Sequence, residues 1–184
     1  AISAYTALPR QHAFDIEYSL LEEAKLPRIP KEQTLSRKVA LVTGAGGGIG
    51  KAIAEKLLAE GANVVFTDIA EDRLKENTAS LSTDLATYAV CDVTHEASIG
   101  DALNKAILSF GGVDIVVHSA GLAISKPLVA TTEKDWDLLQ NVLDKGQFDL
   151  AKQAVQVMRK QGLGGDFISI ASKNGLVSGP NNVG

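Results

Sequence analysis

Short apolar runs alternate with amphipathic segments from residue 38 onward. Each run is short enough for a strand buried on both faces, and the segments between them carry apolar residues at helical spacing. The expected strands are Val39–Thr43, Asn63–Asp68, Ala86–Cys91, Val113–His118 and Phe167–Ala171. The expected helices span residues 48–60, 71–81, 96–110 and 133–161. This alternation predicts repeated βαβ units and a parallel sheet.

Residues 1–37 lack this alternation. Pro9, Pro27 and Pro30 interrupt the segment, with charged residues between them. Because proline breaks helices and central strands, we expect an arm or interdomain linker over residues 1–37 and a separate α/β domain over residues 38–184. Within the arm, the apolar residues between Tyr18 and Leu26 are compatible with one short amphipathic helix.

The composition is that of an ordinary soluble protein, with 45% hydrophobic and 22% charged residues. A net charge of −4 argues against nucleic acid as a partner, and no apolar run is long enough to cross a membrane. The single cysteine, Cys91, fits a reducing compartment, so we expect a cytoplasmic protein. The scattered histidines show no metal-ligand spacing, and we expect no metal.

A glycine-rich turn, Gly44 to Gly50, separates the first expected strand from the first expected helix. Such a turn lets the backbone approach a pyrophosphate, and the helix N-terminus adds N–H groups and a partial positive charge. The alternative is an ordinary tight turn, but the position between a strand and a helix favours a nucleotide site. The sequence therefore predicts a Rossmann-type, doubly wound α/β domain that binds a dinucleotide.

An acidic residue, Asp68, closes the second expected strand. A carboxylate here can accept hydrogen bonds from the adenosine ribose and repel a 2′-phosphate. Neither Ala45 nor Gly46 in the turn is basic, so the sequence favours NAD over NADP. The alternative role for Asp68 is to cap the following helix.

The spacing Thr43-Gly44-x-x-x-Gly48-x-Gly50 resembles the short-chain dehydrogenase/reductase family, and later segments agree with it. Asp92-Val93 resembles the adenine-contacting segment of that family, and Ala120-Gly121 retains half of its Asn-Asn-Ala-Gly motif. The resemblance implies the following cofactor-binding residues: Gly44, Gly48, Ile49, Gly50, Asp68, Asp92, Val93, Ala120 and Gly121.

The segment Ile168 to Ser172 resembles the family's fifth strand and its catalytic serine. The resemblance implies that Ser172 polarises the substrate oxygen, a tyrosine exchanges the proton and a lysine lowers the pKa of that tyrosine. Alternatively, the Ser172 hydroxyl satisfies backbone groups at the end of a strand.

Segments near both ends of the chain, Ala13 to Tyr18 and Ala171 to Val177, resemble a narrower group. This group is the C-terminal dehydrogenase half of bifunctional rhamnulose-1-phosphate aldolase/short-chain dehydrogenases. The resemblance implies a small aldehyde or alcohol substrate such as lactaldehyde, a homo-oligomer and an aldolase domain fused in the parent protein.

The family's Tyr-x-x-x-Lys motif would begin one position beyond Gly184, so we expect a C-terminally truncated domain of about five strands. The family also places an asparagine shortly before a glycine, where this chain has Leu143 before Gly146. The nearby Asn141 is not assigned a role. Two hypotheses follow: an NAD-dependent oxidoreductase without its C-terminal part, or a non-catalytic dinucleotide-binding module.

Overall fold

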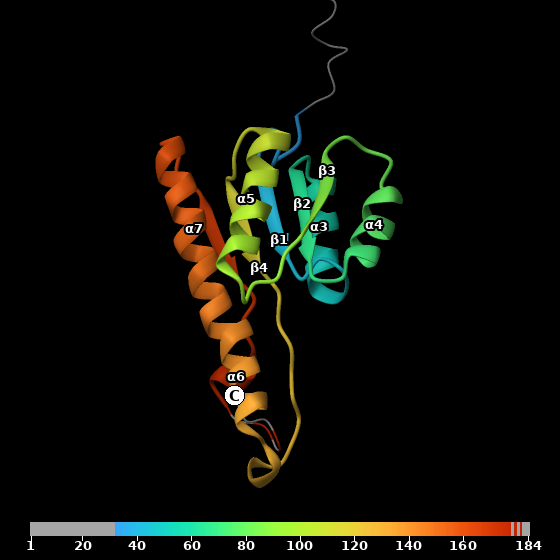
Figure 1. Ribbon diagram of the computed structural model, residues 1–184. Helices are drawn as coiled ribbons and strands as arrows, with labels where there is room; N and C mark the ends of the chain where they lie inside the picture. Colours follow the sequence, from blue (N-terminus) through green and yellow to red (C-terminus); the bar gives the residue numbers. More distant parts are fainter. Residues whose placement is uncertain (1–31, 178, 180, 182–184) are drawn as a thin grey trace, which may run out of the picture. The chain divides into compact units, whose positions relative to one another are not determined.

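The computed structural model describes residues 32–177, 179 and 181. The chain divides into two compact units, residues 1–32 and 33–184. The expected arm helix around Tyr18 lies outside the described residues, so it stays a prediction. The second unit contains a sheet with helices on both faces (Figure 1).

The sheet has five parallel strands in the order β3-β2-β1-β4-β5. The strands are β1 (Val39–Thr43), β2 (Asn63–Asp68), β3 (Ala86–Val90), β4 (Ile115–His118) and β5 (Asp166–Ser169). This is the Rossmann-type α/β fold that the alternating pattern predicts. The last three strands are shorter than expected, because their terminal apolar residues lie in the adjoining loops.

The helices are α3 (Gly48–Ala59), α4 (Glu71–Ala79), α5 (Glu96–Phe110), α6 (Glu133–Gln140) and α7 (Gly146–Gln161). Two 3₁₀ turns, η2 (Leu128–Ala130) and η4 (Lys173–Gly175), lie in loops. Across the described residues, no helix combines the length and the apolar character that crossing a bilayer requires.

The prediction of one continuous α-helix over residues 133–161 is wrong in its middle. A π-helical turn, η3 (Asn141–Lys145), joins α6 to α7. At the junction, Gly146 packs so closely that a Cβ there would lie 3.0 Å from Val93 Cγ2. This contact comes from a loop far away in the sequence, so the helical periodicity does not reveal the interruption.

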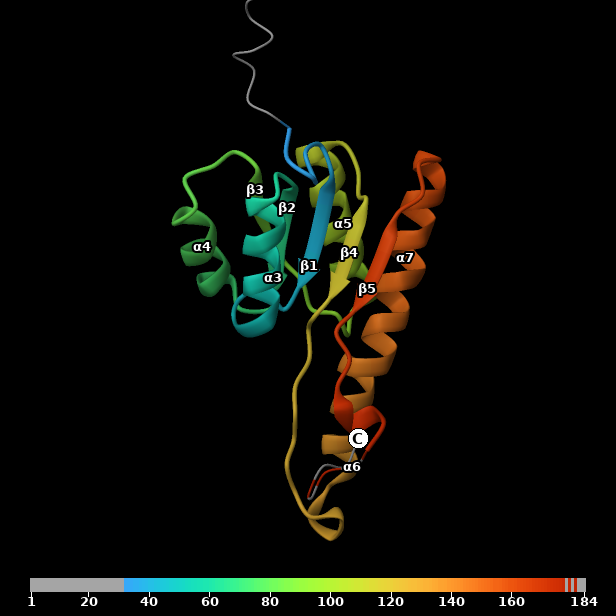
Figure 2. The same ribbon diagram turned by 180° about the vertical axis from the view of Figure 1, so that it is seen from behind.

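Alternate residues of the strands face opposite layers. Val39 and Leu41 pack with α5 and α7, whereas Ala40 and Val42 pack with α3 and α4. Figures 1 and 2 show these helix pairs on opposite faces of the sheet. Phe167 of β5 packs against the first layer, whereas Ile168 is 46% exposed and does not belong to the second cluster of described residues.

The compact unit begins before the boundary that the sequence suggested at residue 38. Gln33 Nε2 donates to the Ala59 carbonyl at 3.0 Å, and the Leu35 N–H donates to the Glu60 carbonyl at 2.9 Å. Leu35 also packs against the α3–α4 layer. Residues 33–37 therefore belong to the α/β unit, because they close the end of α3.

Candidate functional site

The site lies at the carboxyl edge of the sheet, where strand order reverses. The chain passes from β3 across the sheet to β4, so the loops after β1 and β4 leave the sheet in different directions. In open α/β sheets this divergence creates the ligand-binding crevice. A cleft of about 810 Å³ is found here.

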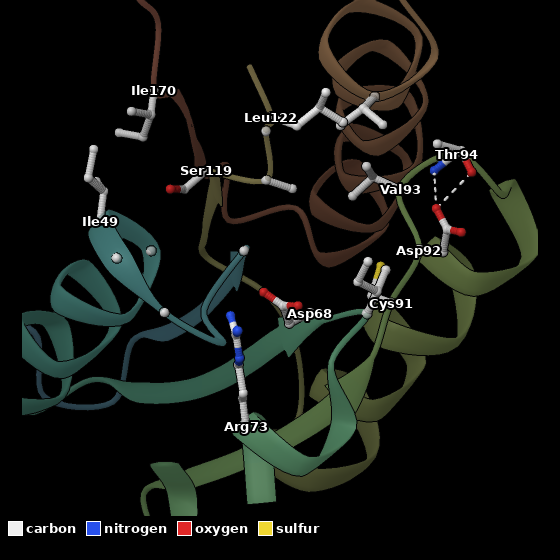
Figure 3. Close-up of a pocket in the computed structure, with 18 of the residues that line it drawn as sticks. Ile49, Asp68, Arg73, Cys91, Asp92, Val93, Thr94, Ser119, Leu122 and Ile170 are labelled. Carbon is white, nitrogen blue, oxygen red and sulfur yellow. Dashed lines mark hydrogen bonds between the residues drawn. The ribbon is translucent and has the colours of Figure 1, made fainter. Parts of the chain in front are cut away.

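The cleft collects all the cofactor-binding residues that the sequence predicts. They come from the loops after β1, β2, β3 and β4 (Figure 3). The predicted residues that line the cleft are Gly44, Gly48, Ile49, Gly50, Asp68, Asp92, Val93, Ala120 and Gly121. Segments far apart in the sequence, from Gly44 to Gly121, thus meet at one crevice.

The glycine turn leaves the start of α3 open to an anion. Gly48 has a φ of +56°, which L side chains rarely adopt, and a Cβ at Gly50 would collide with the Gly44 carbonyl. The first turn of α3 has no side-chain cap and no acidic residue. Its N–H groups and partial positive charge therefore remain available to a phosphate.

Asp68 is held rigidly against the glycine turn. Its Oδ2 accepts a hydrogen bond from the Gly46 N–H at 3.0 Å, and its Oδ1 accepts one from the Ala70 N–H at 2.9 Å. A Cβ at Gly46 would lie 2.7 Å from Asp68 Cγ, so only glycine fits beside the carboxylate. Each carboxylate oxygen keeps a second lone pair for a ligand hydroxyl.

Asp92 lies at the other end of the cleft and is held by its own loop. Its Oδ1 accepts from the Thr94 N–H at 2.9 Å and from the Thr94 hydroxyl at 2.7 Å (Figure 3). Burial acts to raise the pKa of the Asp92 carboxyl, but the bonds from Thr94 and His95 outweigh it, so the pKa is lowered. Asp92 is therefore an anion at neutral pH.

A hydrogen-bond network joins the loops after β1 and β4. Thr43 Oγ1 accepts from the N–H groups of Ser119 at 3.1 Å and Ala120 at 3.0 Å. His118 Nδ1 lies 3.3 Å from the same oxygen. Because Thr43 already accepts two bonds, its hydroxyl donates to Nδ1, which assigns the proton of the neutral ring to Nε2. Burial lowers the pKa of His118 and favours this neutral form.

Several lining residues were missed in the sequence analysis. They are Gly47, Ile69, Arg73, Cys91, Thr94, Ser119, Leu122, Leu138, Val142 and Ile170. Most flank predicted residues and could have been found by extending each motif by a few positions. Leu138 and Val142 belong to α6 and η3, and no local pattern signals their approach to the cleft.

Ser172 is not among the residues that line the cleft. It is exposed, and its Oγ caps η4 by accepting from the Asn174 N–H at 3.2 Å. Ile170, two positions earlier, does reach the cleft. The geometry of the described residues thus matches the backbone-satisfying alternative, and the catalytic role of Ser172 stays a prediction.

Leu143, rather than Asn141, lies near the predicted binding residues. A Cβ at Gly121 would lie 3.3 Å from Leu143 Cδ2, whereas Asn141 is exposed. Across residues 32–177, 179 and 181, no group of three or more His, Cys, Asp or Glu side chains is placed to hold a metal ion. The charged side chains that line the cleft are Asp68, Asp92 and Arg73.

Comparisons with known proteins agree with this geometry. The chain is 38% identical over 185 residues to the uncharacterized oxidoreductase YuxG of Bacillus subtilis, a match that covers 98% of this chain and 27% of that protein. Uncharacterized oxidoreductases of Staphylococcus aureus and Staphylococcus epidermidis are each 38% identical over 142 residues, 77% of this chain and 61% of theirs. The chain thus spans less than two thirds of the length of each of these relatives. Residues 38–184 match the short chain dehydrogenase family, and the chain belongs to that family.

Proposed function

We propose that this chain is the dinucleotide-binding part of an NAD-dependent dehydrogenase that acts on a small aldehyde or alcohol. The family uses NAD or NADP as cofactor. One observation carries the proposal: the predicted cofactor-binding residues from four separate loops line a single cleft at the carboxyl edge of the sheet. The open N-terminus of α3 at this cleft suits a pyrophosphate.

The described residues divide the binding of NAD between them. The glycine turn and the α3 N–H groups hold the pyrophosphate, and Asp68 accepts hydrogen bonds from the adenosine ribose. Asp92 and Val93 contact the adenine, and the Ala120-Gly121 loop adjoins the nicotinamide end. When bound, NAD supplies hydride transfer, while the protein orients it and excludes water. Ser172 is proposed to hold the substrate oxygen.

The substrate and the larger assembly are proposed from the resemblance to the bifunctional aldolase/dehydrogenases. The match to YuxG includes the predicted arm but covers only 27% of that protein. This coverage supports a dehydrogenase unit that is one part of a longer protein. A cytoplasmic location is proposed from the single cysteine alone. A lactaldehyde-like substrate and a homo-oligomer complete the proposal.

A second candidate function is a dinucleotide-binding module without turnover. The position of Leu143 near Gly121 favours it, because the family places a polar asparagine there. The exposed, capping position of Ser172 also favours it. A steady-state assay with NAD and lactaldehyde distinguishes the two: turnover supports the dehydrogenase, whereas NAD binding without turnover supports the module.

Binding of NADH to an Asp68→Ala variant tests the cofactor site. We expect the dissociation constant to rise about 10- to 100-fold, because one charge-assisted hydrogen bond contributes about 1.5–3 kcal/mol. Asp72→Ala is the matched control, since Asp72 is exposed on α4 and does not line the cleft. NADH fluorescence titration gives both constants, and thermal melts of each variant show whether it folds. Equal affinity in the two variants would remove the ribose role of Asp68.

A further inference from the structure

Arg73 is the only cationic residue among those described that line the cleft. It lies in the first turn of α4, and its guanidinium extends toward the glycine turn and Asp68 (Figure 3). A Cβ at Gly47 would lie 3.9 Å from Arg73 Nη1, which places the cation beside the turn. A positive charge thus stands at the end of the cleft that Asp68 occupies.

The neighbouring acidic groups do not neutralise this cation by direct contact. The Asp68 oxygens accept from the Gly46 and Ala70 N–H groups, and Glu71 Oε1 pairs with Lys75 Nζ at 3.0 Å. Within the described part of the chain, Arg73 forms no hydrogen bond and no ion pair. Its N–H donors therefore remain available to a ligand in the cleft.

A carboxylate and a guanidinium have opposite effects on the two nicotinamide dinucleotides. An acidic residue after the second strand selects the ribose 2′-hydroxyl of NAD, whereas a nearby arginine accommodates the 2′-phosphate of NADP. Guanidinium and phosphate form short, bidentate hydrogen bonds. This cleft contains both groups at one end, and Asp68 cannot turn toward Arg73 without losing its two backbone bonds.

We propose that Arg73 is a specificity-determining residue that binds the 2′-phosphate of NADP, so that the site accepts NADP as well as NAD. This inference rests on the proposed dinucleotide function and deepens it. Asp68 favours NAD, and Arg73 offsets the repulsion that Asp68 exerts on the 2′-phosphate. The glycine turn carries no basic residue, which by itself favours NAD. Arg73 of α4 supplies the positive charge that the turn lacks.

Fluorescence titration of the protein and its Arg73→Gln variant with NADPH and NADH tests this proposal. We expect the variant to bind NADPH about tenfold more weakly and NADH within about twofold, because a charged hydrogen bond is lost only with the phosphorylated cofactor. Lys75→Gln is the matched control, since Lys75 lies two residues further along α4 and does not line the cleft. We expect it to change neither constant by more than about twofold.

The outcomes separate this inference from the proposed function. If Arg73 bound the pyrophosphate instead, Arg73→Gln would weaken the binding of NADPH and NADH equally, and the proposal would be overturned. An unchanged ratio of the two constants would overturn it as well, with NAD binding intact. If the unsubstituted protein bound neither dinucleotide, the proposed function itself would fail. An Arg73→Lys variant with intermediate affinity for NADPH would support the bidentate geometry.

Discussion

At the scale of single residues, neighbouring glycines of the turn serve different purposes. A Cβ at Gly46 would meet Asp68 Cγ at 2.7 Å, whereas a Cβ at Gly47 would find its nearest neighbour, Arg73 Nη1, at 3.9 Å. The backbone of Gly47 is extended, with a φ of −175°, so other residues can adopt it. Gly46 is therefore required by packing against the carboxylate, and Gly47 is not.

This difference makes Gly46→Ala and Gly47→Ala a matched pair. We expect Gly46→Ala to lower the free energy of unfolding by about 1–3 kcal/mol, because its methyl group overpacks against Asp68. Gly47→Ala should change the free energy of unfolding by less than about 1 kcal/mol. A small increase would also agree with the argument, because alanine lowers the conformational entropy of the unfolded chain. Urea unfolding without cofactor measures both. The same loss in both variants would contradict the packing argument.

Cys91 is a lining residue that we expect to be chemically inert. It is 4% exposed, and burial raises the pKa of its thiol to about 12. The reactive thiolate is therefore almost absent at neutral pH. Iodoacetamide at pH 7.5 should leave the folded protein unlabelled and label it rapidly in urea, as measured by mass spectrometry. Rapid labelling of the folded protein would show that the thiol is accessible and ionised.

At the scale of elements, a single side chain links the end of α7 to the segment just before β4. Gln161 Oε1 accepts from the Val113 N–H at 2.8 Å, and its Nε2 donates to the Val113 carbonyl at 2.9 Å. Gly162 then ends the helix in a left-handed conformation. The Gln161 side chain thus satisfies both backbone groups of Val113 and links α7 to the segment before β4.

We expect Gln161→Ala to destabilise the fold by about 1–3 kcal/mol, because two backbone groups lose their partner. Lys160→Ala is the control, since Lys160 is exposed on the same helical turn and should change stability by less than about 0.5 kcal/mol. Urea unfolding measures both. A Gln161→Glu variant should also be destabilised at neutral pH, because a carboxylate cannot donate to the Val113 carbonyl. A neutral effect of Gln161→Ala would indicate that water replaces the amide.

At the scale of the whole molecule, we expect acid stability to depend on His118 in the buried network between β1 and β4. His118 is 3% exposed, and in the described structure its Nε2 has no hydrogen-bond partner. Burial lowers the pKa of His118 in the folded state below its ordinary value of about 6.5. The unfolded chain therefore binds this proton at a higher pH than the folded protein does.

The sign of the pH dependence follows from that difference. The stability associated with neutral His118 is fully present above about pH 6.5 and is lost as the pH falls below it, by at most about 1.4 kcal/mol per pH unit. Urea unfolding at pH 7.5 and pH 5.5 should show a smaller loss in a His118→Asn variant than in the unsubstituted protein. Equal losses would show that other groups cause the acid sensitivity.

The fold class, the glycine turn and the family can all be predicted from the amino-acid sequence. Apolar runs of strand length can be recognised within a few residues, and so can glycines between a strand and a helix. Neither pattern requires knowing which distant segments come into contact. The first two strands accordingly match their predicted bounds, and the predicted cofactor-binding residues reach one cleft. The last three strands are predicted less well, because apolar residues continue past the paired region.

Which other side chains approach that cleft depends on how the elements pack in three dimensions. The position of Arg73 beside Gly47, the π-helical turn before Gly146 and the Thr43–His118 contact all join residues distant in the sequence. Each depends on the direction of a side chain or on packing between layers, and neither quantity is encoded in a local pattern. The sequence alone therefore predicts that a dinucleotide binds. The packing of α4 against the turn places the positive charge of Arg73 at the cleft, and this charge is the basis for proposing that NADP binds as well as NAD.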